Sequence, residues 1–374
     1  MFKFKEFLHN FDESIKSSLE TILNIRFSNE NWDECTLPVK FGGLGVRTTT
    51  DICVPAFISS SYSTLNLVGN ILSRSSNDFE ISCLEEAIIA WKDLCPEHAL
   101  PTSQTIQKCW DIPIIQLKHT AIITNAQSPA DKARLLAIQR PESGAWLNAL
   151  PSPQLGLLLD PDTVRISVGL RLGLPLCEEH KCICGSLVDS TGRHGLSCLK
   201  ITGRYFRHHG MNDIIKRSSG TAGFPAILEP PGLTRTDGKR PDGLTLVPWR
   251  KGRSLLWDAT CVDTFAKSYL NSTSKESGAA AKLAERQKFQ DYETLCSNYE
   301  FVPFAVETMG VFSDSAMKFT NELGKYLILA TDDKRAKSFF LQRISICIQR
   351  GNSASILATL PSTAADKFNE IFYL

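Results

Sequence analysis

The sequence predicts a mainly α-helical N-terminal half and an α/β C-terminal half in which helices flank a sheet. Apolar residues recur at helical spacing through much of the first half. The second half contains short β-prone runs, at residues 243–247, 254–262 and 301–312. Helical stretches follow or separate these runs, at residues 277–295, 314–330 and 336–350. Because 374 residues suffice for two or three domains, we predict domains at residues 1–155, 156–217 and 218–374.

The composition is that of a globular protein, with 43% hydrophobic and 22% charged residues. A net charge of +1 provides no overall basic field, so any nucleic-acid binding must come from a local patch. No run approaches 18 apolar residues, so we expect no membrane span. The first ten residues carry early charges and lack the apolar core of a secretory signal. We therefore expect an intracellular protein whose 12 cysteines serve as thiols and metal ligands.

The first half is predicted to be a series of helices. Residues 1 to about 30 carry one apolar face, which is typical of a packing helix. Gly42, Gly43 and Gly45 invite a phosphate-loop interpretation, but no strand precedes them and no Gly-Lys-Ser/Thr follows, so we predict a turn into a helix. A later helix begins with Asp160 as its cap and Pro161 at its first position, after a boundary at Pro151-Ser-Pro153. Further helices are expected at residues 83–91, 105–124 and 129–139.

A short stretch rich in cysteine and histidine is the clearest metal signal. Cysteine and histidine together suit tetrahedral Zn2+ in a closed structural site, which can fix a loop that has little core of its own. The one-residue gap between the first two cysteines is tighter than usual, and Cys177 or His180 just upstream could replace one ligand. The alternative is a loop with incidental thiols. The candidate ligands are Cys182, Cys184, His194 and Cys198.

The stretch from Gly203 to Arg217 mixes basic with aromatic side chains. Tyr205 and Phe206 lie among the basic residues, and positive charge beside aromatic rings suits phosphate contact and base stacking. The alternative is an ordinary helix with a solvated basic face. We predict nucleic-acid contacts from Arg204, Arg207, His209 and Arg217.

Two aspartates accompany the first two β-prone runs. Asp242 immediately precedes the first run, Asp258 lies within the second, and residues 248–252 between them have turn chemistry. If the runs pair as a hairpin, the two carboxylates converge and can bind Mg2+ or Mn2+, which activates water and stabilises phosphoryl displacement. The alternative is that Pro-Asp-Gly is only a turn and Asp258 a surface acid. Cations that could contact a phosphodiester nearby are Arg240, Arg250 and Lys251.

The helix predicted at residues 277–295 carries two candidate catalytic lysines. Lys282, Glu285 and Lys288 are three residues apart and share roughly one face. Such charges are usually only solvated. One lysine could instead point at the metal site and stabilise developing negative charge. Glu307, in the third β-prone run, is a candidate auxiliary catalytic residue.

Two stretches resemble parts of LINE-type (non-LTR) retrotransposon proteins. Leu37-Pro38 and Gly42-Gly-Leu-Gly-Val-Arg47, followed by a helix of small residues, resemble the segment just beyond the polymerase core of their reverse transcriptases. From Cys182 onward, a Cys-Cys-His-Cys knuckle followed by Pro-Asp…Asp is similar to their C-terminal restriction-like endonuclease of the PD-(D/E)xK class. The resemblance implies a restriction-endonuclease-like mixed sheet flanked by helices. It implies no polymerase activity, because we find no counterpart of the polymerase's paired aspartates.

The resemblance also implies roles for individual residues. Asp242 and Asp258 would be metal ligands, and Lys288 would be the catalytic lysine, with Lys282 as the alternate. Tyr292, one turn beyond Lys288, would lie close by. Thr260 stands where the common motif has its lysine, so the lysine is expected on the following helix instead.

These patterns predict a DNA endonuclease that depends on Mg2+ or Mn2+ and nicks target DNA. Structural Zn2+ is the expected second cofactor, and DNA is the expected partner, with an RNA template as a further one. Such a protein would act in the nucleus. The alternative is a catalytically inactive, zinc-stabilised protein that binds nucleic acid or serves as a scaffold.

Overall fold

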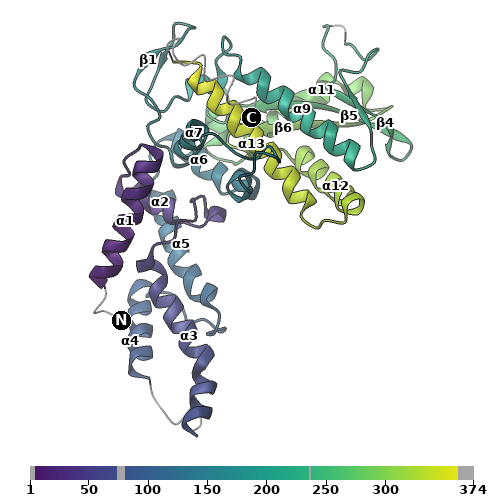
Figure 1. The fold of residues 1–374 in the computed structure, drawn as a ribbon. Coiled ribbons are helices and arrows are strands. Elements are labelled where there is room, and N and C mark those ends of the chain that lie inside the picture. The colour runs from purple at the N-terminus through teal and green to yellow at the C-terminus, as the bar shows by residue number, and fades with distance from the viewer. Residues whose placement is uncertain (1–4, 74–80, 236, 361–374) are drawn as a thin grey trace. The chain divides into compact units, whose positions relative to one another are not determined.

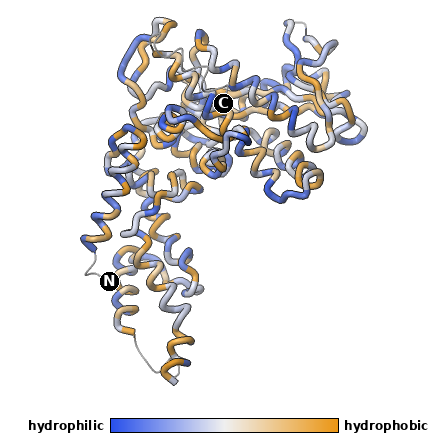
Figure 2. The backbone as a smooth tube through the Cα atoms, in the orientation of Figure 1, coloured by the Kyte–Doolittle hydropathy of each residue, from blue (hydrophilic) through white to orange (hydrophobic). Residues whose placement is uncertain are grey.

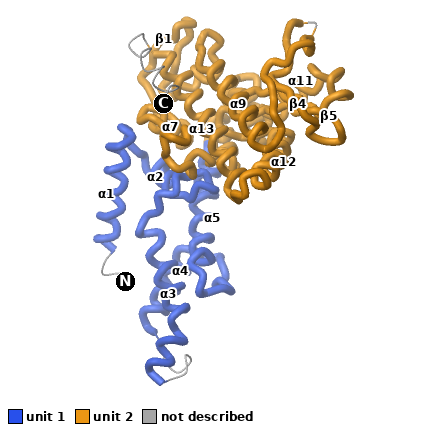
Figure 3. Tube along the Cα trace, turned by 45° about the vertical axis from the view of Figure 1, so that its right-hand side comes forward, with its two compact units in different colours: residues 1–126 blue, residues 127–374 orange. Residues whose placement is uncertain are grey.

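The structure is a computed structural model that describes residues 5–73, 81–235 and 237–360. The outer ends of the first and last predicted domains, residues 1–4 and 361–374, lie outside this description. Two compact units make up the chain, residues 1–126 and residues 127–374 (Figure 3). Within the described ranges, no helix combines the length and the apolar character that a membrane crossing requires.

Unit 1 is entirely helical in its described part. Its core is formed by Trp91 and Trp110, which pack edge to face with ring centroids 5.1 Å apart, together with Ile58 and Leu84. Trp91 Nε1 donates to the Trp110 carbonyl oxygen at 2.9 Å, so the Trp91 ring is buried with its polar atom satisfied. The elements are α1 (Lys5–Leu23), α2 (Asn29–Thr36), η2 (Val39–Phe41), α3 (Thr49–Leu72), α4 (Ser82–Leu94) and α5 (Gln107–Asn125), as drawn in Figure 1.

The first predicted helix is shorter than the sequence pattern indicated. Hydrophobic and hydrophilic positions alternate along α1 in Figure 2, as the spacing predicted. The helix ends at Leu23 rather than near residue 30, because Asn24 adopts a left-handed conformation with φ 50°. Ser28 then caps a separate helix, α2, by accepting a hydrogen bond from Asn31 N–H at 3.2 Å.

Unit 2 contains all the strands that the structure describes. Its elements before the sheet are α6 (Pro129–Ile138), η3 (Pro141–Asn148), α7 (Pro161–Leu172), β1 (His180–Lys181), β2 (Leu187–Val188), α8 (His194–Ser197) and α9 (Gly203–Thr221). The sheet and its later helices are β3 (Ala226–Leu228), β4 (Gly243–Arg250), β5 (Arg253–Val262), α10 (Leu270–Thr273), α11 (Ala279–Asp291), η4 (Glu293–Leu295), β6 (Glu300–Glu307), α12 (Asp314–Thr331) and α13 (Ala336–Leu357).

The main sheet is mixed, in the order β3-β4-β5-β6. β3, β4 and β5 are antiparallel neighbours, and β6 lies parallel to β5, with Asp258 opposite Pro303. A parallel neighbour requires a crossover, which here runs through α10 and α11. The α/β prediction and the hairpin of residues 243–262 are therefore confirmed.

Helices cover both faces of this sheet. On one face Trp257 and Phe304 pack with residues of α9, α12 and α13 into a large core cluster. On the other face Leu256 and Phe301 pack against Tyr292, which directly follows α11. Successive β5 side chains alternate between these faces, as the pleat of a strand requires. Asp258 consequently shares the α11 face with Leu256.

Several predicted boundaries differ from those of the structure. The hairpin turn is confined to Lys251-Gly252, because β4 continues through Pro248 with irregular pairing. The third β-prone run ends as a strand at Glu307, and α13 continues to Leu357 rather than ending at Arg350. α13 contacts η3, α7, α8 and α9, so elements from all three predicted domains share one core. The division into compact units falls at residue 126, within the first predicted domain.

Candidate functional site

Asp242 is held at the start of β4 by backbone contacts with β5 and with Glu229. Its N–H donates to the Trp257 carbonyl oxygen at 3.0 Å, and its own carbonyl accepts from Glu229 N–H at 2.8 Å. Gly243 pairs directly with Trp257, and a Cβ at Gly243 would lie 2.0 Å from the Trp257 ring. Only glycine allows this approach, so the Pro-Asp-Gly sequence fixes Asp242 beside Asp258 instead of forming only a turn.

Asp258 contacts a cation and a hydroxyl from the crossover. The residue is only 4% exposed, and its Oδ1 lies 2.7 Å from Lys288 Nζ. The Tyr292 hydroxyl lies near enough to Asp258 to lower the pKa of its carboxyl. Burial and then the charge of Asp242 raise the pKa of Asp258, while Lys288 opposes that rise. The two aspartates are therefore close enough for the charge of Asp242 to act on Asp258, and the positive charge of Lys288 offsets part of this effect.

A histidine that the sequence analysis did not select completes the contacts of Asp242. Asp242 Oδ2 accepts from Ala259 N–H at 2.6 Å and lies 3.0 Å from His208 Nε2. Burial lowers the pKa of His208, but the hydrogen bond and charge of Asp242 outweigh it and raise the pKa above its usual value. His208 lies in the basic stretch of α9, and its position on that helix brings its ring to Asp242.

α9 is joined to the sheet behind His208. Asn212 Nδ2 lies 3.4 Å from His208 Nε2, and Asn212 Oδ1 accepts from Trp257 Nε1 at 2.9 Å. This chain of contacts links the histidine to the same strand that carries Asp258. A pocket of about 220 Å³ opens beside Asp242. Its lining is His208, His209, Asn212, Leu228, Glu229 and Asp242.

Two residues predicted to be catalytic lie away from this cluster. Lys282 pairs with Glu276. Glu307 is fully buried, and its Oε1 accepts from Ala280 N–H at 3.0 Å and from Ala281 N–H at 3.3 Å. Glu307 therefore caps the N-terminus of α11 and lies opposite Val262, four residues along β5 from Asp258. The structure does not bring it to the carboxylate pair.

The predicted nucleic-acid contacts divide into buried and exposed residues. Arg207 is 2% exposed and donates to Asn352 Oδ1 at 2.6 Å, so it joins α9 to α13 and cannot contact a ligand in solution. Arg250 pairs with Glu300 and Glu322, and Arg240 pairs with Glu229. The remaining predicted contacts are half-buried or exposed: Arg204, His209, Arg217 and Lys251.

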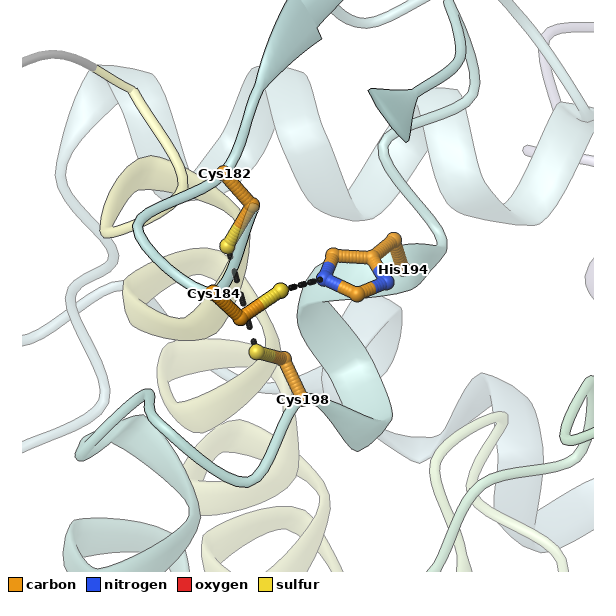
Figure 4. A group of neighbouring side chains, drawn as sticks. All are labelled: Cys182, Cys184, His194 and Cys198. Atoms are coloured by element: carbon orange, nitrogen blue, oxygen red, sulfur yellow. Dashed lines mark hydrogen bonds between the residues drawn. The ribbon is translucent and has the colours of Figure 1, made fainter. Parts of the chain in front are cut away.

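The predicted metal ligands form one compact cluster, which Figure 4 shows. Their ligand atoms all lie within 4.8 Å of one another. Cys184 Sγ is 3.2 Å from His194 Nε2, and Cys182 Sγ is 3.8 Å from Cys198 Sγ. Hydrogen bonding from Ser186 lowers the pKa of Cys184 to about 6, which favours the thiolate that binds metals. The arrangement could hold a metal ion such as structural zinc.

The two alternative ligands are occupied elsewhere. Cys177 Sγ faces the Asp189 carbonyl oxygen at 3.4 Å. His180 Nδ1 faces the Glu178 carbonyl oxygen, and its Nε2 faces Thr359 Oγ1 at 2.9 Å. The cluster therefore consists of the four predicted ligands, and neither Cys177 nor His180 replaces one of them.

The Cys/His cluster packs directly onto α13. A Cβ at Gly195 would lie 2.6 Å from the Ser355 carbonyl oxygen, and a Cβ at Gly203 would lie 2.5 Å from Ser355 Oγ. The backbones of α8 and of the first residue of α9 therefore lie close to α13. Since α9 carries His208, α13 supports both the Cys/His cluster and the helix that positions His208.

No protein-family model matches the chain, and no curated protein matches it.

Proposed function

We propose that this chain is a metal-dependent DNA endonuclease derived from a non-LTR retrotransposon, which nicks target DNA and has no polymerase activity. The observation that carries the proposal is the contact of Lys288 with buried Asp258 beside Asp242. Two neighbouring carboxylates on one sheet, with a cation from an adjacent helix, are a catalytic combination for phosphodiester hydrolysis. The knuckle and the Pro-Asp…Asp pattern resemble those of the retrotransposon endonucleases and support the same function. The proposal includes action in the nucleus and an RNA template as a further partner.

The donor set fits a hard divalent cation. Asp242 and Asp258 are both carboxylates, and the charge of Asp242 raises the pKa of Asp258. A divalent ion relieves that repulsion, and carboxylate oxygens are the ligands that Mg2+ and Mn2+ prefer. When bound by these two residues, the ion would activate a water molecule and offset negative charge on the phosphate.

The protein's own groups would orient the ligands and stabilise the phosphate. His208 and Ala259 N–H both hold Oδ2 of Asp242, so they fix the orientation of the carboxylate that would bind the ion. Lys288 is 25% exposed at its side chain, so it can reach a bound phosphate and place positive charge where negative charge develops. Tyr292 lies beside Asp258 and favours its ionised form, since it lowers the pKa of that carboxyl.

Nicking of supercoiled plasmid by the full chain tests the proposal. We expect open-circular product with Mg2+ or Mn2+ and none when both ions are chelated. Folded protein that binds plasmid without nicking it would contradict the proposal and favour the non-catalytic nucleic-acid-binding protein.

We further propose that the Cys182, Cys184, His194 and Cys198 cluster holds structural Zn2+. Cys182 and Cys184 lie between β1 and β2, and His194 and Cys198 lie at the two ends of α8. These short elements share a small apolar core, so metal binding would supply folding free energy there. Replacing Cys198 with Ser should remove bound zinc and lower the melting temperature, with early loss of structure in residues 177–200. Atomic absorption would measure the bound zinc, and thermal denaturation would measure the melting temperature.

Cys83→Ser is the matched control, since Cys83 is an exposed thiol on α4. It should retain full zinc content and the wild-type melting temperature. Equal zinc content in Cys198→Ser and wild type would contradict the assignment.

His208 should act as a positioning residue for Asp242. His208→Ala removes the partner 3.0 Å from the carboxylate, and second-layer partners of metal ligands typically contribute about 10-fold to 100-fold. We expect a loss of that size in nicking rate and a higher Mg2+ concentration for half-maximal rate. His208→Asn, which keeps a polar partner, should recover part of both. Equal Mg2+ dependence in wild type and His208→Ala would contradict this role.

A further inference from the structure

We infer that the first half of α9 is a stacking platform for an unpaired DNA strand, which leads that strand to the Asp242–Asp258 pair. This inference rests on the proposed endonuclease function and specifies its substrate as DNA with unpaired nucleotides next to the nicked phosphodiester.

Large apolar and aromatic side chains are exposed where a folded protein normally buries them. Tyr205 is 57% exposed and Phe206 39% exposed, on the first turn of α9. Leu199, four residues before α9, is 79% exposed. Aromatic rings contribute strongly to core stability when buried, so their exposure beside each other indicates a surface that contacts a ligand.

The chain segment that carries these rings has charges of one sign. Residues 190–212 contain no aspartate or glutamate. Exposed Lys200 precedes the rings, and the Arg204 guanidinium lies 5.9 Å from the Tyr205 ring centroid. A polyanion is therefore the complementary partner. A neutral protein surface would not account for the cations, and an acidic protein surface would not account for the exposed rings.

The platform continues to the candidate active site. Tyr205 and His209 are four residues apart and share one face of α9, about 6 Å apart along the helix axis. His209 lines the pocket beside Asp242, and the rings of His208 and His209 meet edge to face with centroids 5.7 Å apart. A strand lying on Tyr205 would thus reach His209 and then Asp242 within one helical turn.

Unpaired DNA uses this surface better than duplex DNA does. Cations alone suffice to hold the phosphates of a duplex, whose bases are stacked inside and hidden from a ring on a helix surface. Stacking on an aromatic ring requires a base face that unpairing exposes. The combination of Tyr205, Phe206 and flanking cations therefore favours an unpaired strand.

Binding of matched DNA substrates tests the inference without cleavage. We would measure fluorescence anisotropy in the absence of divalent ions, with one labelled sequence prepared as a full duplex and as a duplex with a short unpaired bubble. Wild type should bind the bubble more tightly. Tyr205→Ala should weaken bubble binding at least about fivefold and duplex binding less, whereas Tyr205→Phe keeps the ring and should retain the preference. Leu329→Ala, which removes a side chain 80% exposed on α12, is the matched control and should bind as wild type does.

Nicking of the same substrates with Mg2+ separates the two proposals. Faster nicking at the bubble supports the inference. Equal binding and equal nicking of bubble and duplex would overturn the inference and leave the endonuclease proposal intact. Bubble-selective binding with no nicking of either substrate would overturn the endonuclease, and with it the substrate that this subsection assigns. A loss of affinity in Tyr205→Phe as large as in Tyr205→Ala would also overturn the stacking role.

Discussion

Replacing Asp258 with Asn should abolish nicking, with a rate loss of at least about 10³-fold, because a metal ligand contributes several kcal/mol of transition-state stabilisation. Asn has the same shape as Asp and keeps one oxygen, so the packing around Leu256 and Tyr292 should remain. Plasmid nicking gives the rate. Divalent-ion stabilisation is the second measurement, because an ion that binds only the folded protein raises its melting temperature. Mg2+ or Mn2+ should raise the melting temperature of wild type and not that of Asp258→Asn.

The pKa of Asp258 indicates that this variant will fold. Burial and the charge of Asp242 raise that pKa in the folded state. A carboxyl with a raised folded pKa contributes stability below its unfolded pKa, and that contribution is lost as pH rises through the folded pKa. Without metal, ionisation of Asp258 therefore costs folding free energy, and uncharged Asn carries no such cost. We expect Asp258→Asn to melt no lower than wild type at pH 7.

Glu322→Gln is the matched control for this variant. Glu322 also pairs with a cation, since its Oε1 lies 3.2 Å from Arg250 Nη1, but it belongs to α12 and lies outside the carboxylate pair. The control should nick at the wild-type rate. Wild-type nicking by Asp258→Asn would refute the proposed metal site.

Replacing Glu307 with Ala should lower the free energy of unfolding by about 3–5 kcal/mol. Glu307 has no exposed surface and accepts hydrogen bonds from Ala280 N–H, Ala281 N–H and the Thr264 hydroxyl, the last at 3.1 Å. Alanine would leave these three donors buried without an acceptor and create a cavity at the end of β6. Urea denaturation followed by circular dichroism would measure the change.

Glu307→Gln distinguishes a structural from a catalytic role. Glutamine keeps an acceptor for the two backbone N–H groups of α11 and can donate to the Thr264 hydroxyl. Burial raises the pKa of Glu307, so loss of the charge should cost little stability. We expect Glu307→Gln to fold and nick nearly as wild type does. A folded Glu307→Gln without nicking would restore Glu307 as the auxiliary catalytic residue that the sequence suggested.

Local sequence patterns predicted the features whose causes are local. The β-prone runs around Lys251-Gly252 paired as a hairpin, and Asp160 caps α7 with Oδ1 accepting from Thr163 N–H at 2.9 Å. The Cys-x-Cys and His-x3-Cys spacing placed four ligand atoms together without any long-range information. In each case the decisive contacts join residues close in the chain, so composition and spacing were sufficient.

Features that depend on tertiary packing could not be predicted in this way. α9 carries polar residues on all sides, so apolar spacing gave no inward face. Docking on α13 buries Arg207, which the sequence assigned to nucleic acid, and turns His208 toward Asp242. Glu307 is similar, since only the arrival of the α11 N-terminus beside β6 determines that it caps a helix.

The parallel pairing of β5 with β6 also governs when the site forms during folding. The chain must cross the sheet through residues 263–299 before β6 can pair, and both Lys288 and Tyr292 lie in that crossover. Contacts between residues distant in sequence form slowly, because loop-closure entropy must be overcome first. We expect the hairpin to bring the two aspartates together early and the lysine to reach them late. A nascent chain that ends at Tyr292 would contain His208, both aspartates and Lys288, yet lack the strand on which the crossover docks.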